Sequence, residues 1–577
     1  MTRTEFEHLP NELIIKILKY LTAVDAWYAF YNLNTRLDGL VQASSIDFDL
    51  SCCRKSQFDF TRKHIFKKIE VPFAVKFCPR LMIEQTEQLF FETKSKNVLQ
   101  LLQSLTLINL TDDTIDIVRK KLSDFINLRS LTIMHDSEES KGKFVTKIMN
   151  VNLPLLTYLK LGYTGRRSGL VFDERELYKC RFNVPNVQEF ILRIPITFNI
   201  LYRFLSMLPQ IVSIDVIVSA RKGEEYMNKP NDFSPRINLQ KLVITMNGIV
   251  PFTTMARFLR SLPQLHTFWF SAFICNYTAG AEYQDGAIWE ELIRTHLPNL
   301  TDFRLNVGLE AAETATPSSV MQSFRSNFWT EEKKWWFVAD RPENDVDTIE
   351  LYSLPPPTDD KIIFRPNVPW VSNSALPNFD SIRTLEILPI SEHRRSAPGS
   401  PRQYTNATTI RSATVYTYNH SYDTSILSNY VNFAKATTCT VDSPRFFATL
   451  PMMTNITSLE IRCYDGDVDC LRSLSSPLRT IKRLTLSESL NCYFCNLCDV
   501  DLFTRLFPNL EYISIRIAEF ACLPILMNSL CHLVYAVILN DPEAIDIGDL
   551  KKWLYKSETG MQYKWALENT RLDIWID

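Results

Sequence analysis

The sequence predicts an α/β protein in two parts: three short N-terminal helices, then an irregular solenoid whose strands form a parallel sheet on its concave face. Two observations predict this. Apolar residues recur at helical spacing within residues 1–45, and an apolar-x-x-apolar-x-apolar pattern recurs beyond residue 100. Between copies of that pattern the apolar period changes from 2 to 3.6, so strands alternate with helices. The chain has 577 residues, more than the roughly 250–300 that one core can organise, which favours an open-ended repeat.

Composition narrows the classes of function. The net charge is -2 and the pI about 6.5, so no bulk positive field favours binding to nucleic acid or to an anionic membrane. No run approaches the roughly 18 apolar residues of a membrane span, and residues 1–20 lack the features of a signal peptide. The 13 cysteines are therefore expected to be reduced, in a chain that is cytoplasmic, nuclear or both.

Residues 9–41 predict three helices. Pro10 suits the first turn of a helix whose apolar stripe is Leu13, Ile14, Ile17, Leu18 and Leu21. Asp25 is placed to cap a second helix and Asn34 a third, which carries Leu37. So short a segment can barely close a core of its own. Either part of its apolar surface meets a partner, or the helices cap the domain that follows.

The order of residues from Leu9 to Val41 is similar to the F-box. The matching positions are Leu9, Pro10, Glu12, Leu13, Ile14, Ile17, Leu18, Tyr20, Leu21, Asp25, Leu33, Asn34 and Arg36. Leu37 departs from the pattern, since many F-boxes carry a tryptophan there. The resemblance implies that residues 1–45 dock on a Skp-type adaptor held by a cullin scaffold. The adaptor-binding residues that it implies are Leu9, Pro10, Leu13, Ile14, Ile17, Leu18, Leu21, Leu33, Arg36 and Leu37.

The rest of the chain repeats. Clear copies of the strand pattern begin at Leu102, Leu128, Leu156, Val187, Ile211, Leu239, Leu265, Leu300, Val346, Ile382, Ile456, Ile481 and Leu510, and weaker ones at Ile410, Ala436 and Leu533. Most lie 20–36 residues apart, a spacing similar to that of leucine-rich repeats. Several follow a Leu-Pro or Phe-Pro step, where proline ends the preceding helix. We expect one continuous parallel sheet in sequence order, with Leu105, Leu131, Leu159, Leu242 and Leu459 facing the interior.

The expected organisation is therefore helices at 1–45, a connector at 46–100 and the leucine-rich-repeat-like solenoid at 101–577. Insertions interrupt the repeat near 308–345 and 389–406. The first contains Trp329, Trp335 and Trp336 beside two lysines, a mixture typical of protein interfaces. It is expected either to bind a target, with at least one tryptophan accessible, or to form a short strand with all three in the core.

The remaining candidates for chemistry are few. Cys492, Cys495 and Cys498 could supply three thiolate ligands to a metal, but cysteines at this spacing also pack as small apolar residues. No histidine pair, phosphate-binding loop or nucleophile motif is present, so no catalytic residue, resident cofactor or metal is expected. The resemblance implies a substrate-recognition subunit of a cullin-type ubiquitin ligase that binds a target protein. The alternative is a non-catalytic interaction scaffold without a role in ubiquitin transfer.

Overall fold

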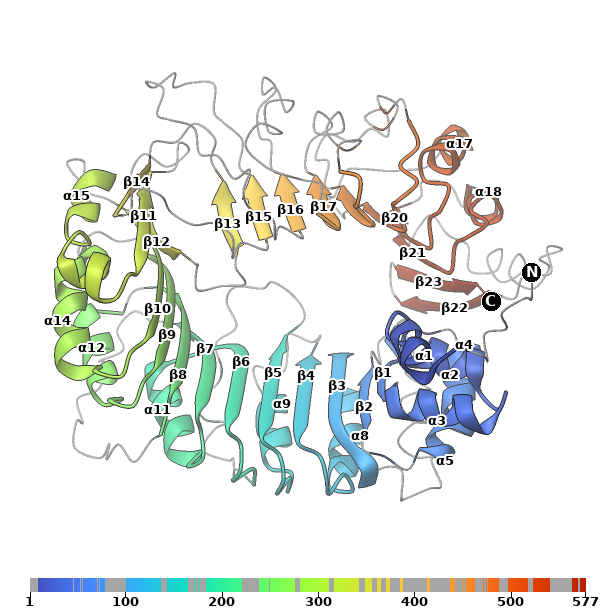
Figure 1. Cartoon of the computed structure of the whole chain (residues 1–577), viewed down its shortest axis with the longest axis horizontal. Helices are drawn as coiled ribbons and strands as arrows, with labels where there is room; N and C mark the ends of the chain where they lie inside the picture. Colours follow the sequence, from blue (N-terminus) through green and yellow to red (C-terminus); the bar gives the residue numbers. More distant parts are fainter. Residues whose placement is uncertain are drawn as a thin grey trace. The chain divides into compact units, whose positions relative to one another are not determined.

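A computed structural model of the chain provides the fold (Figure 1). The described residues are 9–44, 46–51, 53, 55–69, 71, 73–77, 100–135, 143–163, 172, 175, 183–219, 238–248, 250–274, 281–310, 316–341, 348–354, 361–364, 370–373, 384–387, 412–415, 436–441, 450, 453–461, 471, 474, 476–486, 497–516, 522–539, 563–568 and 571–576. Their strands form sheets of 13 and 10 strands. The chain divides into two compact units, residues 1–274 with 291–303 and residues 275–290 with 304–577.

Three helices open the first unit: α1 (Asn11–Leu18), α2 (Ala23–Phe30) and α3 (Thr35–Ser44). Pro10 lies at the cap of α1 rather than inside its first turn. The predicted cap of α2 is wrong: Thr22 is the N-cap, and its hydroxyl oxygen accepts from the Asp25 amide at 3.1 Å. The predicted cap of α3 is confirmed, because Asn34 Oδ1 accepts from the Leu37 amide at 2.8 Å.

The stretch expected as a connector braces these helices and starts the sheet. It contains β1 (Asp47–Asp49), α4 (Lys55–Phe60), the π-helical turn η2 (Thr61–Ile65), α5 (Phe66–Lys68) and β2 (Phe73–Phe77). Gln57 donates to Asp25 at 2.8 Å, and Lys68 pairs with Asp38 at 3.0 Å. The Phe60 ring packs edge-on against Tyr31 at 5.0 Å. The three N-terminal helices therefore pack against α4 and α5, which precede β2, in addition to being covalently connected to them.

The first unit then alternates strands and helices. The strands are β3 (Leu102–Leu110), β4 (Ser130–His135), β5 (Tyr158–Tyr163), β6 (Glu189–Ile196), β7 (Ser213–Ser219), β8 (Lys241–Asn247) and β9 (Thr267–Ile274). From β1 to β9 each pairs in parallel with the next in sequence. Leu105, Leu131, Leu159 and Leu242 are buried, as predicted. This is the leucine-rich-repeat-like stacking of strand and helix units that the periodicity predicts.

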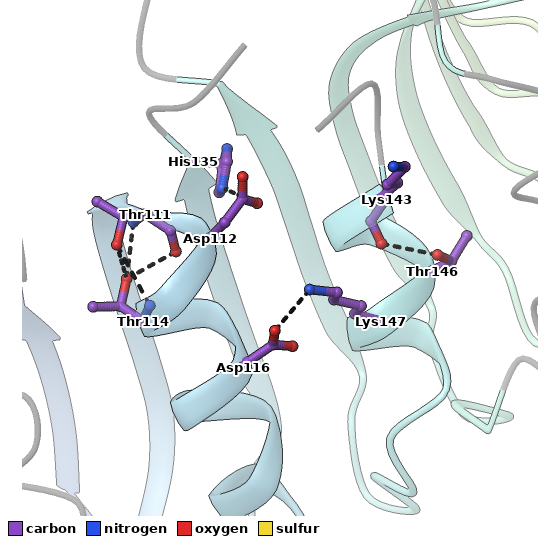
Figure 2. A network of polar contacts seen from close by, with 8 residues as sticks. All are labelled: Thr111, Asp112, Thr114, Asp116, His135, Lys143, Thr146 and Lys147. Carbon is purple, nitrogen blue, oxygen red and sulfur yellow. Dashed lines mark hydrogen bonds and ion pairs between the residues drawn. The ribbon is translucent and has the colours of Figure 1, made fainter. Parts of the chain in front are cut away.

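Helices cover one face of this sheet. They are α8 (Asp112–Leu122), α9 (Lys143–Met149), α11 (Phe198–Met207) and α12 (Phe252–Arg260). Figure 2 shows α8 and α9 side by side, joined by an ion pair of 3.0 Å between Lys147 and Asp116. At the start of α8, His135 of β4 lies 3.3 Å from Asp112, and its ring stacks on Phe144 at 4.9 Å. The opposite side of the strands is called the open face below.

A recurring turn fixes where each strand begins. In the described Leu-Pro and Phe-Pro steps that lead into a strand, the amide three residues after the first apolar residue donates to its carbonyl, as Ile211 does to Leu208 at 3.1 Å and Leu510 to Phe507 at 3.3 Å. In several turns the residue before the strand pattern is an asparagine that donates to the backbone of the preceding unit. These bonds are Asn127 to Gln100 (2.7 Å), Asn186 to Pro154 (2.6 Å), Asn299 to Pro263 (3.2 Å) and Asn509 to Arg479 (2.8 Å). The sequence did not reveal a role for this asparagine, because the asparagine typical of such repeats follows the strand rather than preceding it.

The expectation of one continuous parallel sheet is wrong at the first insertion. In the second unit, β10 (Asp302–Glu310) pairs antiparallel with β12 (Thr348–Leu354), and β12 pairs antiparallel with β11 (Trp336–Asp340). A further short strand, β14 (Trp370–Ser372), pairs antiparallel with β11. The insertion also contains α15 (Pro317–Gln322) and the π-helical turn η5 (Phe328–Glu332), and α14 (Gly286–His296) precedes β10. The copy at Val346 is thus a strand, but its direction is reversed.

The parallel repeat resumes in a separate sheet. Its strands are β13 (Lys361–Phe364), β15 (Thr384–Ile387), β16 (Ser412–Val415), β17 (Thr438–Val441), β18 (Ser458–Ile461), β19 (Arg483–Leu486), β20 (Tyr512–Arg516) and β21 (Tyr535–Leu539), paired in that order. Leu459 is buried, as predicted. Helices α17 (Leu497–Leu506) and α18 (Cys522–Ser529) belong to the last units. An antiparallel hairpin, β22 (Tyr563–Glu568) and β23 (Arg571–Ile576), ends the sheet at β21. The insertion expected near 389–406 lies outside the described residues.

Candidate functional site

Two surfaces stand out, and the first is on α1. Ile14 and Leu18 face α3 and are buried, whereas Leu13 and Ile17 on the other side of α1 are 44% and 39% exposed. The chain continues this exposed side past the end of the helix with Tyr20 and Leu21. We call Leu13, Ile17, Tyr20 and Leu21 the α1 surface. Six of the nine large apolar residues that are exposed in the described part of the chain lie between residues 13 and 33. Such a concentration is typical of a docking surface.

Local hydrogen bonds hold the α1 surface in place. The Arg36 guanidinium donates from Nε to Asn11 Oδ1 at 2.8 Å and from Nη2 to the Leu9 carbonyl at 2.6 Å. An arginine on α3 therefore fixes the start of α1. Trp27 on α2 is buried inside the same three-helix module, and α3 contributes Leu37 and Val41 to its interior. The α1 surface is thus presented by a braced scaffold rather than by a loose end.

The residues implied as adaptor contacts fall into two sets in the structure. Ile14, Leu18 and Leu37 form the interior of the module, so they shape it rather than meet solvent. Leu13, Ile17, Leu21, Leu33 and Pro10 are exposed, and Leu9 is half-buried. Arg36 is also exposed but is engaged with Asn11 and Leu9. No adaptor is present, so adaptor contact by these residues stays a prediction.

The second surface is the open face of the first unit. Along β7 the buried residues Ile214 and Val216 alternate with half-buried Ser213 and Asp215, and the same alternation occurs in β4. The buried set meets the helices, as Phe190 of β6 meets Phe204 of α11 at 5.1 Å. The half-buried set therefore forms the open face. On β3 and β4 it carries no charged residue, whereas from β5 to β9 it carries several.

An ion pair lies at the centre of the charged part. Arg193 on β6 binds both carboxylate oxygens of Asp215 on β7, at 2.6 and 2.7 Å. Burial raises the pKa of the Asp215 carboxyl above its usual value, although Arg193, Lys241 and Lys160 act in the opposite direction. Asp215 is therefore a partly buried carboxylate among three cations, with both oxygens already used by Arg193.

Aromatic residues lie on both sides of this ion pair. On β8, Lys241 lies over the Trp269 ring of β9 at 4.6 Å, and Trp269 Nε1 donates to Asp302 at 2.8 Å. On β5, burial and the neighbouring Glu189 carboxylate raise the pKa of Tyr158. Trp269 and Tyr158 are both half-buried, so each offers an apolar ring that is already held in place.

The aromatic insertion is largely an internal cluster. Trp329 is fully buried against Phe324, Phe328 and Phe337, which corrects its assignment as a target contact. Trp335 and Trp336 are half-buried, and Trp336 begins β11. The Lys333 ammonium lies 5.2 Å from the centre of the Trp335 ring. Trp329 is therefore a core residue, although it lies in η5 rather than in a strand. Target binding by Trp335 and Trp336 stays a prediction.

The second unit carries a smaller stacked row on its sheet. The Arg483 guanidinium of β19 lies 4.6 Å from the Tyr512 ring of β20, whose centroid is 5.5 Å from that of Tyr535 on β21. Arg483 is exposed, and the two tyrosines are half-buried. The row repeats the cation-on-aromatic arrangement of Lys241 and Trp269, without a central ion pair.

The cysteine cluster cannot be placed as a metal site. Cys492 and Cys495 lie outside the described residues, and of Cys498 only its place in α17 is described. Over the described ranges, no group of three or more His, Cys, Asp or Glu residues is arranged to hold a metal ion. Burial raises the pKa of the Cys439 thiol, which keeps it protonated as a small apolar core residue. Within those ranges, the helices are also too short or too polar to cross a membrane.

No protein-family model matches the sequence, and no curated protein matches it either. Among solved structures, the leucine-rich repeat-containing protein LegL7 from Legionella pneumophila aligns at 12% identity and a TM-score of 0.27, covering 48% of this chain and 96% of that one. A leucine-rich-repeat protein of Leptospira interrogans aligns at 11% identity and a TM-score of 0.20, covering 83% of this chain and 92% of that one.

Proposed function

We propose that this protein is the substrate-recognition subunit of a cullin-type ubiquitin ligase. The α1 surface docks on a Skp-type adaptor, and the strand–helix repeats hold a target protein. The proposal draws on the similarity of residues 9–41 to the F-box and on one structural observation, the exposed Leu13, Ile17, Tyr20 and Leu21 on a module that is braced by contacts from Gln57 and Lys68.

In this function the protein brings a target and an enzyme together and does not itself catalyse a chemical reaction. A receptor that holds a target beside a ubiquitin-charged conjugating enzyme replaces an encounter in dilute solution by one at roughly millimolar effective concentration. The target lysine and the catalytic cysteine both belong to other chains. This chain contributes two binding surfaces and the sheet in which β1 to β9 are consecutive neighbours.

Adaptor binding is tested by truncating the exposed side chains of α1. In the double variant Leu13→Ala/Ile17→Ala, the affinity for a purified Skp-type adaptor should fall by about 100-fold, because buried apolar contacts at interface centres contribute most of the binding energy. Ile126→Ala/Leu155→Ala is the matched control, since both residues are large, apolar and similarly exposed at 52% and 42%. Wild-type adaptor affinity in the α1 variant would contradict the proposal.

Ubiquitin transfer is tested separately. In a reconstituted reaction with adaptor, cullin and conjugating enzyme, we expect ubiquitin to be attached to lysines of this chain itself, and the Leu13→Ala/Ile17→Ala variant to lose that modification. Adaptor binding without any transfer would favour the alternative of an interaction scaffold.

A further inference from the structure

The open face of β5 to β9 carries two half-buried lysines, Lys160 and Lys241, beside the Arg193–Asp215 ion pair. We propose that it is the target-binding surface and that its occupant is an extended, acidic segment of a target protein, rich in aspartate and glutamate. This inference rests on the proposed function and names the chemistry of the partner.

Two lysines on this face have no carboxylate partner of their own among the described residues. Lys160 on β5 and Lys241 on β8 are half-buried, and neither forms an ion pair with any described residue. Asp215 is the carboxylate among them, but Arg193 occupies both of its oxygens. A half-buried ammonium interacts with a carboxylate more strongly than a fully solvated one does, because water screens it less. An acidic segment would supply the two missing carboxylates.

Acidic side chains other than Asp215, namely Asp302 and Glu189, also lie at this face. Asp302 accepts a hydrogen bond from Trp269, so its carboxylate is already engaged. Glu189 is exposed at the start of β6, in register with Tyr158 and with Ser213. Its charge opposes an acidic partner. Among the described residues of this face, the charges without an ion pair are therefore two half-buried cations, Lys160 and Lys241, and one exposed anion, Glu189. This excess favours an acidic occupant over a basic one.

The spacing of the two lysines suits an extended chain. Lys160 and Lys241 are three strands apart and two residues out of register, a separation of about 16 Å at roughly 4.8 Å between strands and roughly 3.3 Å along them. An extended chain covers that distance in about five residues, at about 3.3 Å for each. Beside Lys241, the Trp269 ring is held by the lysine on its face and by Asp302 at its nitrogen. It is thus an anchor for an apolar side chain of the same segment, with little conformational entropy left to lose.

The experiment selects partners without assuming one. A library of random 12-residue peptides displayed on phage is selected on the purified full-length chain, and the bound sequences are read. We expect enrichment of net-negative peptides with acidic residues about five positions apart. The strongest peptide is then synthesised, and its affinity is measured by fluorescence anisotropy.

Three variants test whether the charges of this face determine the affinity for the selected peptide. Lys160→Glu/Lys241→Glu should weaken the selected peptide by at least about 100-fold. Lys120→Glu/Lys143→Glu is the matched control, because both residues are exposed on α8 and α9 and the change in charge is the same; it should change the affinity less than about 3-fold. Glu189→Gln should strengthen binding by about 3-fold, since it removes the one opposing charge.

The outcomes separate this inference from the proposed function. Enrichment of basic or uncharged peptides, no enrichment at all, or equal binding to Lys160→Glu/Lys241→Glu each overturns it. No adaptor takes part in the selection, so its failure leaves adaptor docking by α1 intact. Conversely, loss of the proposed ligase role through the Leu13→Ala/Ile17→Ala test leaves an acidic-peptide site standing on the open face.

Discussion

The N-terminal helices and the strand repeats contain the same kinds of apolar residue, but they leave them in opposite places. Leu131, Leu159 and Leu242 in the strands are completely buried, whereas Leu13 and Leu21 at α1 are 44% and 39% exposed. A strand–helix unit always has a neighbouring unit or its own helix to cover it. Helix α1 has α3 on one side and no described part of the chain over its exposed side. An apolar stripe in a sequence therefore predicts a surface that needs covering, but not whether this chain or another one covers it.

Replacing one leucine in each region should give the largest contrast. Leu159→Ala removes a fully buried side chain from β5 and should lower the free energy of unfolding by about 3 kcal/mol, through lost burial and the cavity left behind. Leu13→Ala should lower it by less than about 0.5 kcal/mol, because the side chain is already in water. Urea unfolding with amide exchange in β4 to β6 measures both. Equal losses would mean that Leu13 is part of the module's own core.

The Arg193–Asp215 pair sharpens the comparison, because it is charged, partly buried and part of the repeats. The folded chain raises the Asp215 pKa, chiefly by burial, so the folded state binds more protons there than the unfolded state does. Wild-type stability should therefore fall as pH rises from the unfolded pKa of Asp, about 3.9, through the raised folded value. Asp215→Asn removes that contribution, so the unfolding free energy of wild type minus variant should decrease with rising pH. An increase would show that Arg193 outweighs burial.

The smallest effect concerns the asparagines that join successive units. Asn186→Ala removes the 2.6 Å hydrogen bond to the Pro154 carbonyl and should lower the unfolding free energy by about 1 kcal/mol, the usual net contribution of such a bond. Asn152→Ala, at an exposed position for which no hydrogen bond is found in the described structure, is the control and should be nearly neutral. Thermal unfolding measures the pair. Identical midpoints would show that the turns alone fix the spacing of the units.

Most strands of the repeat could be predicted, because the alternation of buried and exposed side chains along a strand is visible within a few residues of sequence. All the strand patterns, including the weak ones at Ile410, Ala436 and Leu533, coincide with or run into a strand. Strand direction could not be predicted at Val346, since alternation looks the same in parallel and antiparallel strands. The cap of α2 was missed because Thr22 and Asp25 both suit a helix start, and the hydroxyl of Thr22 is the one positioned to accept from the chain.

The candidate surfaces show the same division. The stripe on α1 was visible in the sequence, but its exposed half was not, because exposure depends on α3 and on the connector. The Arg193–Asp215 pair joins residues 22 positions apart, and only the register of β6 and β7 brings them together. Trp329 was misassigned for a related reason: its burial depends on Phe324 and Phe337, which flank it in space rather than at a helical or strand period.

The turn that precedes each strand affects how the length and number of the repeat units can change in evolution. Because the turn and the asparagine bond set the start of a strand against the unit before it, the length of the segment that follows the strand is under no such constraint. Residues can be gained or lost there without shifting the next strand, as the uneven spacing of the units illustrates. Duplication or deletion of a whole unit would likewise preserve the register on either side. A recognition surface built in this way can be lengthened or shortened one strand at a time.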